Sequence, residues 1–526
     1  MISLHELRAP SEDGGILYFP DLSLITELIK ENQKKLSTAQ TFIFEKPLKE
    51  LRLLAKQEAI SAAMAFLKTN DQEIKVDNTL PLMVSGHQPE LFHPGVWIKN
   101  FALHSIAKKH SLTPLNLIID NDVAKHASIS VPRIADGVKK SGVVNCNFDK
   151  DNSGMPYEDW AIKNHEIFDR FSEHLKGLTS DWESIPMGVT FWQDVSKAVA
   201  TGLKPGLAFT HARRKYEQHL GCNNLELPVS TLCGTNSFSL FAMDIISKAE
   251  AFANLFNQAV ATYRTKHGLK SKNHPFPDLG VAKGWAETPF WLLLPGESRR
   301  QRLGVKKEAS GEIILGTPGP QGIRISLGVN DQLTALRNLE MQGTRIRPRA
   351  LSTTIFARLV LSDAFIHGIG GAKYDEVTDQ MIQNFYQVMP PAFMVVSATA
   401  RLNLVKKIKT EAEVKVANQV ARDIWWNPQR HAPAKPDSQW EALIVQRKNL
   451  LQLLGNSHSE RKERYQKLRA NLDGLRVWVQ SMHQHKADHA KTMVEEFKVQ
   501  QQLQSRDYSF ILHSEQKLKS LFKPFL

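Results

Sequence analysis

Side chains that can hold charge or transfer protons gather at two points of the stretch 80–126. The first point follows an apolar run and consists of Gly86, His87, Gln88, Pro89 and His93. The second follows another apolar run and consists of Asp120, Asn121, Asp122 and His126. Imidazole transfers protons near neutral pH, and a carboxylate can orient an amine or a hydroxyl. We therefore predict a site for a small polar molecule, with His87, Asp120 and Asp122 as its catalytic residues.

A strand, a helix and a second strand are the elements that would position these two groups. The run 81–85 and the run 115–119 are continuously apolar, as in parallel strands that are covered on both faces. Between them, apolar residues recur near the helical period from Val96 to Ala107. In such a unit, ligands lie outside the carboxyl ends of the strands. The residues predicted to bind a ligand or cofactor here are Gly86, Gln88, Pro89, His93, Lys99 and His126. The structural alternative is that such residues cap helices and form turns.

A second turn with the composition of a ligand site lies at 368–371. Gly368, Gly370 and Gly371 open a predicted helix, and Lys373 adds a positive charge. Backbone N–H groups at such a turn can bind a phosphate or a carboxylate. A tight connection without any ligand would have the same sequence, so both interpretations stay open.

Several kinds of site are disfavoured by the spacing of residues. Five side chains near the first site are competent metal ligands, namely His87, His93, Asp120, Asp122 and His126. They show no tight ligand spacing such as HExxH, so no metal is predicted. The chain also has no P-loop and no assembled nucleophilic triad. Any use of ATP would have to proceed without a P-loop.

Composition restricts the class of protein and its partners. The chain has 526 residues, a length that corresponds to about three domains. Of these residues 42% are hydrophobic, so the chain can form a large core. Cys146, Cys222 and Cys233 are far apart in the sequence, as expected for a protein in a reducing cytoplasm. The sequence has no long uncharged apolar run, so no membrane-spanning segment is expected. The net charge of +13 favours anionic partners. No nucleic-acid motif accompanies the basic clusters, so a small molecule is favoured over nucleic acid.

The pattern along the chain predicts an α/β protein with a parallel-sheet core and a helical arm. Residues 1–79 are expected to be a helical segment that packs on the core. Residues 80–425 are expected to form the core, with an antiparallel insertion near 285–330. Residues 426–505 contain leucines at helical spacing, with a corner at Gly455-Asn456, and predict a helical hairpin or coiled coil. Residues 506–526 are expected to return to the core, and the arm's apolar pattern is equally compatible with a homodimer.

These motifs resemble one family, the cysteine-adding enzymes of bacillithiol biosynthesis. The turn from Ser85 to Gly95, SGHQPELFHPG, is similar to the family's first motif, and Asp120-Asn121-Asp122 stands in the place of its acidic cluster. Arg347-Pro348-Arg349 and the turn 368–371 follow its later motifs. His87 stands where the family has glutamine, and the family's Glu-Asp-His-Asp cluster is shortened here.

The resemblance implies a Rossmann-like core related to nucleotidyltransferases, a coiled-coil arm, and ligation of an amine-bearing small molecule with a nucleotide such as ATP or ADP bound. We therefore expect a ligase or transferase that acts on a small polar, amine-bearing or phosphorylated substrate. The alternative is a non-catalytic basic protein that engages nucleic acid or a partner through its helical arm.

Overall fold

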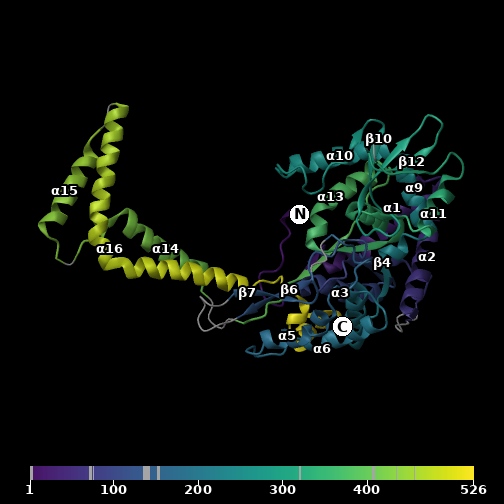
Figure 1. Ribbon diagram of the computed structural model, residues 1–526, viewed down its shortest axis with the longest axis horizontal. Helices are drawn as coiled ribbons and strands as arrows, with labels where there is room; N and C mark the ends of the chain where they lie inside the picture. Colours follow the sequence, from purple (N-terminus) through teal and green to yellow (C-terminus); the bar gives the residue numbers. More distant parts are fainter. Residues whose placement is uncertain are drawn as a thin grey trace. The chain divides into compact units, whose positions relative to one another are not determined.

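The chain is a mixed α/β protein with a mostly parallel main sheet (Figure 1). The computed structural model describes residues 4–69, 74, 76–133, 142–150, 154–318, 322–404, 409–433, 435–454 and 457–526. Two compact units can be distinguished. The first comprises Met1–Val131, Asn145–Arg401 and Arg506–Leu526, and the second comprises Pro132–Val144 and Leu402–Ser505.

The main sheet of the first unit has five parallel strands and one antiparallel edge strand. In spatial order the strands are β1 (Ile16–Phe19), β16 (Met394–Ala398), β15 (Ala364–His367), β4 (Leu82–His87), β5 (Thr113–Ile118) and β8 (Leu225–Pro228). Only β1 runs antiparallel to its neighbour. Most residues of the parallel strands are buried, which explains why their sequences are apolar runs without alternation.

The order of the strands reverses between β4 and β15. From β4 the chain moves outward through β5 to β8, and it then returns to the other side of β4 to form β15 and β16. Where an open parallel sheet reverses in this way, a crevice opens beside the carboxyl ends of the two strands, and ligands bind there. The loops that follow β4 and β15 are therefore the expected binding position of this sheet.

Two helices begin at these strand ends. Helix α3 (Pro94–Lys109) packs on β4, β5 and β16, and its first residue is a proline, which lacks the N–H that would have no partner there. The Nδ1 of His93 accepts a hydrogen bond from the Gly95 N–H and caps this helix. Helix α13 (Ile369–Asn384) starts directly after β15. The carboxyl ends of β4 and β15 therefore lie near two helix N-termini.

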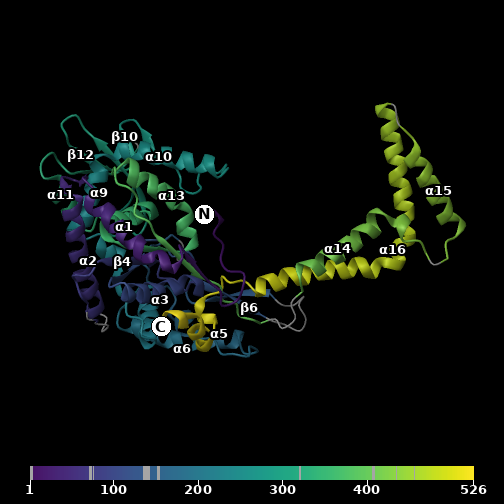
Figure 2. The ribbon, with the colours of Figure 1, turned by 180° about the vertical axis from the view of Figure 1, so that it is seen from behind.

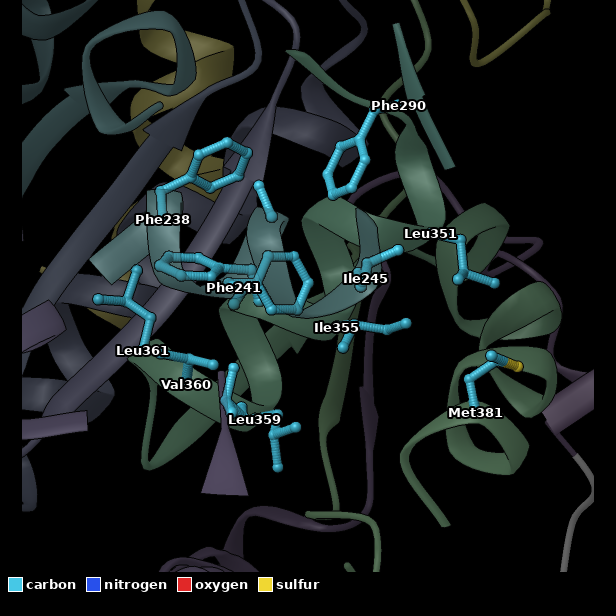
Figure 3. Packing of buried hydrophobic residues seen from close by; sticks show 14 of the residues in the cluster. Phe238, Phe241, Ile245, Phe290, Leu351, Ile355, Leu359, Val360, Leu361 and Met381 are labelled. Atoms are coloured by element: carbon cyan, nitrogen blue, oxygen red, sulfur yellow. The ribbon is translucent and has the colours of Figure 1, made fainter. Parts of the chain in front are cut away.

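The remaining helices surround this sheet and build an extensive apolar core. Figure 3 shows part of this core, in which Phe238, Phe241 and Ile355 pack together. At most 3% of the surface of each of these residues is exposed. The helices of the first unit besides α3 and α13 are α1 (Ile25–Thr38), α2 (Leu48–Thr69), α4 (His165–Asp169), α5 (Phe171–Leu178), α6 (Gly188–Ala200), α7 (Pro205–His219), α8 (Val229–Leu232), α9 (Asn236–Ser247), α10 (Ala249–Lys266), α11 (Gln332–Met341), α12 (Ala350–Ile355) and α17 (Glu515–Phe522).

A second sheet in the same unit is antiparallel. Its strands, in spatial order, are β13 (Arg324–Ser326), β12 (Ile313–Gly316), β11 (Gln301–Lys307), β10 (Trp285–Leu293) and β14 (Arg345–Pro348), with β9 (Val281–Ala282) also paired to β10. The region expected as an antiparallel insertion, 285–330, contributes β10 to β13. The Asn121 Nδ2 donates to the Pro348 carbonyl over 2.7 Å, which connects the end of β5 to this sheet.

Two short hairpins complete the strands, β2 (Phe42–Ile43) with β3 (Lys46–Pro47) and β6 (Ser128–Arg133) with β7 (Gly142–Asn147). The N-terminal segment, predicted as helical with one short extended piece, contains α1 and α2 but also supplies β1 to the main sheet. That edge strand was not predicted.

The second unit is helical (Figure 2). Helices α14 (Glu411–Trp426) and α15 (Ser438–Gln452) both pack on α16 (His458–Leu503), around a small cluster of Ile424, Trp440, Leu475 and Val479. The predicted corner Gly455-Asn456 lies outside the described residues. Over the described ranges, no helix has the length and apolarity that a membrane span requires.

Candidate functional site

A cavity of about 700 Å³ opens at the carboxyl ends of β4, β5 and β15. Its walls come from the loops after these strands, from the first turns of α3, α12 and α13, and from β10 of the second sheet. The cavity therefore lies at the reversal of strand order, where the topology of the sheet places a ligand.

Most of the predicted binding residues line this cavity. They are Gly86, His87, Gln88, His93, Lys99, Asp122, Gly368, Gly370 and Gly371. Four predicted residues do not line it, namely Pro89, Asp120, His126 and Lys373. Pro89 is buried against Gly206 of α7, His126 is exposed, and the Lys373 carbonyl accepts a hydrogen bond from the Tyr263 hydroxyl.

Asp120 has a structural environment, although it was predicted to be catalytic. Its carboxylate accepts hydrogen bonds from the Ser230 backbone N–H, over 2.9 Å, and from the Ser230 hydroxyl. It thereby satisfies the N-terminus of α8, in the manner of a capping residue. Burial raises the pKa of Asp120 to about 6, even though both bonds from Ser230 favour the charged form.

We expect Asp120→Asn to change how stability depends on pH. The unfolded carboxyl loses its proton near pH 4, whereas the folded one keeps it to about pH 6. The contribution of this group to stability is therefore full below about pH 4 and is lost as the pH rises to about 6. The asparagine cannot ionise. As the pH rises from about 4 to about 6, the melting temperature of the variant should therefore rise relative to that of the wild type. If the melting temperatures of the two proteins change with pH by the same amount from pH 4 to 7, the raised pKa assigned to Asp120 is wrong.

Lys99 is the cation at the centre of the site. Its side chain projects from α3, and Nζ donates to the Gly86 carbonyl over 3.0 Å. Only 4% of the residue is exposed, and burial lowers its pKa to about 8. Within the described part of the chain, no carboxylate forms an ion pair with it. Such a cation can hold an anionic group that enters the cavity.

Gly86 allows the backbone to come close at this point, and Gly368 lies beside the Lys99 side chain. A Cβ on Gly86 would lie 2.9 Å from the Leu117 carbonyl oxygen of β5, and the nearest atom to a Cβ on Gly368 is the Lys99 Cδ at 4.0 Å. The first contact makes glycine necessary for the pairing of β4 and β5. The second shows that the Lys99 side chain runs beside the residue that precedes α13.

The two histidines that were predicted to act near Lys99 are uncharged at neutral pH. Burial and the nearby Lys99 lower the pKa of His87 to about 3, and burial and Arg506 lower that of His93 to about 4. The Nδ1 of His87 lies 3.2 Å from the Gln88 carbonyl oxygen, whereas that of His93 caps α3. These environments argue against either ring as a proton carrier near pH 7, but both can still form hydrogen bonds to a ligand.

Asp122 positions its neighbours. Its Oδ2 accepts from the Gln88 Nε2 over 2.9 Å, and its Oδ1 accepts from Arg300 over 3.2 Å. Arg300 also lies over the Trp291 ring, which Arg349 contacts as well, with distances of 4.7 and 4.9 Å to the ring centroid. Arg349 is paired with Glu287 as Arg300 is with Asp122, so the cavity combines two ion pairs with an aromatic wall.

His367 is one of the cavity residues that the sequence did not predict. His367 ends β15, lines the cavity, and places its Nε2 2.9 Å from the Asp375 Oδ2 on α13. Arg358, from the π-helical turn Phe356–Leu361, also binds Asp375. The sequence did contain a signal for a strand end here. The apolar run 364–366 is followed by His367-Gly368, much as the strand 82–87 ends in Gly86-His87. No strand was predicted for this segment.

Groups of three or more His, Cys, Asp or Glu that could hold a metal ion do not occur among the described residues. In comparisons with known proteins, no protein-family model matches the chain, and no curated sequence matches it.

Proposed function

We propose that this protein is a ligase or transferase that acts on a small polar substrate, amine-bearing or phosphorylated, and that it resembles the cysteine-adding enzymes of bacillithiol biosynthesis. In this proposal the main sheet and its helices are a Rossmann-like core, and the second unit is a coiled-coil arm. The observation that carries the proposal is Lys99, a buried ammonium group that faces a cavity and has no carboxylate partner in the described ranges.

The surroundings of Lys99 support an anionic ligand. A buried charge is costly unless it is paired, so an unpaired cation at a cavity wall favours binding of an anion. The N-terminus of α13 begins beside Lys99, and free N–H groups at a helix N-terminus favour phosphate or carboxylate. Arg300 and Arg349 also line the cavity, where Asp122 and Glu287 pair with them. A nucleotide such as ATP or ADP would supply phosphates for Lys99 and a planar base for the wall at Trp291.

Catalysis in this proposal is group transfer between bound molecules. Gln88 and the glycines 368, 370 and 371 would hold the anionic portion, and Asp122 would orient Gln88 and an incoming amine. The protein's three cysteines are all buried, and burial raises the pKa of each thiol, so the nucleophile is better supplied by the substrate.

We expect Lys99→Met to weaken the binding of ADP about 10- to 100-fold, the usual loss for a hydrogen bond to a charged group. Wild-type affinity should also fall as the pH rises from 7 to 9, since the ammonium group is lost near pH 8. In the variant the affinity should be independent of pH over this range. Isothermal titration calorimetry measures both effects.

Lys108→Met is the matched control, because Lys108 is an exposed lysine on the same helix. It should leave the affinity for ADP unchanged. A thermal-shift screen of nucleotides, amino acids and amino sugars extends the test to substrates, since a ligand that binds only the folded state raises the melting temperature. The proposal fails if no compound of these classes shifts the melting temperature.

The alternative of a non-catalytic binding protein rests on the second unit. Several large apolar side chains are exposed there, including Val416, Trp425, Trp426 and Leu454. These could pair with a second copy of the chain, and the arm's lysines and arginines could contact nucleic acid. Binding of nucleic acid that weakens steeply with salt, together with no response to nucleotides or amines, would favour this alternative.

A further inference from the structure

His367 and Asp375 form a pair whose proton positions are fixed by their surroundings. Asp375 is buried, which opposes its charged form, but Arg358 and His367 more than offset this and hold its pKa at about 2. An ionised carboxylate can only accept hydrogen bonds. In the neutral ring, the Nε2 that faces Asp375 therefore carries the proton, and the lone pair is left on Nδ1.

The Nδ1 of His367 lies beside Gly371. A Cβ added to Gly371 would be 2.7 Å from this nitrogen, so the absence of a side chain there keeps the approach clear. Nδ1 has no hydrogen-bond partner among the residues that the structure describes. Phe365 and Phe393 hold the ring edge-to-face, with centroid distances of 4.6 and 4.9 Å. The ring is thus oriented on three sides, and its basic nitrogen is not occupied.

His367 lines the same cavity as Lys99. Strand β15 pairs in parallel with β4, and Ile366 lies opposite Ser85, so the ends of the two strands are neighbours. A Cβ added to Gly368, the residue after His367, would lie 4.0 Å from the Lys99 Cδ. An anion held by Lys99 would place the rest of the ligand beside the imidazole.

We propose that His367 is the general base of this site, oriented by Asp375, and that it deprotonates the amine or hydroxyl of the attacking substrate. The N–H or O–H bond of that substrate breaks, its electron pair stays on the nucleophilic atom, and the proton forms a bond to Nδ1. The resulting imidazolium is stabilised by the Asp375 carboxylate. The inference rests on the proposed function, and it extends that function by naming the residue that removes the proton.

The two other histidines of the cavity are less suited to this task. His93 uses its Nδ1 to cap α3, and the His87 Nδ1 is directed at the Gln88 carbonyl oxygen. Among the described residues, no carboxylate lies within hydrogen-bond distance of either ring, and the Glu90 carboxylate is 3.8 Å from the His87 Nδ1. Only His367 combines a carboxylate partner with a basic nitrogen that has no partner in the described part of the cavity.

The first test is His367→Asn in the full-length chain. We expect the affinity for ADP to stay within about twofold of wild type, while the kcat for products formed from ATP and amino acids or amino sugars falls about 10²- to 10⁴-fold. The control is His431→Asn, because His431 in the second unit also places Nε2 2.9 Å from an aspartate, Asp423. It should leave both quantities unchanged. Wild-type turnover by the His367 variant would overturn the inference while leaving the proposed function intact.

A second test needs no substrate and no variant. Diethyl pyrocarbonate acylates unprotonated imidazole nitrogens, and peptide mapping locates the products. We expect His367 of the wild-type protein to be modified at pH 7, more slowly when ADP is present. An unmodified His367 in a protein whose His431 is modified would overturn the inference, even if ADP binds. Absence of ADP binding, with His367 modified, would instead reject the proposed nucleotide site and support the reactive nitrogen.

Discussion

Arg213→Met is expected to lower the free energy of unfolding of the first unit by about 3–5 kcal/mol, the range found when one partner of a buried ion pair is removed. Arg213 bridges Glu217 and Glu226, with 2.5 Å between its nitrogens and one carboxylate oxygen of each. Both glutamate side chains are fully buried. Methionine has a similar volume but no charge, so two carboxylates would lose their common cation.

The remaining hydrogen-bond partners of these glutamates cannot replace the cation. Arg214 also lies near both, but its guanidinium donates to the Asn224 carbonyl and forms no ion pair with either glutamate among the described residues. Glu217 accepts from the Trp97 and Asn100 side chains, and Glu226 accepts from the Asn116 side chain. These neutral donors satisfy some lone pairs but do not neutralise the charge. Because Trp97 and Asn100 belong to α3, loss of Arg213 should loosen the helix that carries Lys99. Urea denaturation followed by tryptophan fluorescence measures the change.

Arg170→Met is the control for Arg213, since Arg170 pairs with Glu166 and Glu173 on the surface and its side chain is 70% exposed. Exposed pairs contribute about 1 kcal/mol or less. The triple variant Arg213→Met, Glu217→Gln, Glu226→Gln removes all three charges and should recover part of the lost stability. Equal denaturation midpoints for the Arg170 and Arg213 single variants would show that the buried network is not electrostatically important.

Arg358→Met should destabilise the first unit by a similar amount, about 3–5 kcal/mol. The guanidinium is 1% exposed and binds Asp375, Asp379 over 2.7 Å, and the Pro391 carbonyl. Without it, Asp375 would be a buried carboxylate with only His367 and the Thr378 side chain as its partners. Its pKa should rise, because Arg358 is the largest influence that favours its charged form. Denaturation in urea reports the stability, and the change should be larger at pH 8 than at pH 5.

The double variant Arg358→Met, Asp375→Asn tests the origin of this effect. It removes the unpaired charge along with the arginine, so it should be more stable than the single variant. It should also bind ADP, because neither residue contacts the cavity directly, while His367 would lack its carboxylate. If the single and double variants unfold at the same urea concentration, the loss comes from packing and not from the charge on Asp375.

The main sheet shows which parts of the fold could be predicted. The strand, helix and strand from Leu82 to Ile118 was predicted from its apolar runs, because continuous burial on both faces leaves a pattern in local sequence. The edge strand β1 was not, since its pairing with β16 joins segments far apart in the chain; Ile16 and Ala398 are 382 positions apart (398 − 16). The half-buried residues of β1 have no distinctive period.

The site was also predicted in part. Asp120 and Asp122 were equivalent in sequence, as acidic residues at the end of a strand. In the structure Asp122 lines the cavity, whereas Asp120 binds Ser230, which is 110 residues later. His367 was overlooked because its importance depends on Asp375 and Arg358, and neither partner can be identified until α13 and the π-helical turn are packed together.

The sequence by itself determined that polar residues stand at the ends of buried strands and that glycines precede a helix, because these features depend on local burial and backbone freedom. Only the tertiary structure decided which strand ends are neighbours. The reversal between β4 and β15 brings Lys99 and His367 into one cavity, although 268 positions separate them (367 − 99). Charge, pKa and access depend on such non-local neighbours, since desolvation and ion pairing act through space and not along the chain.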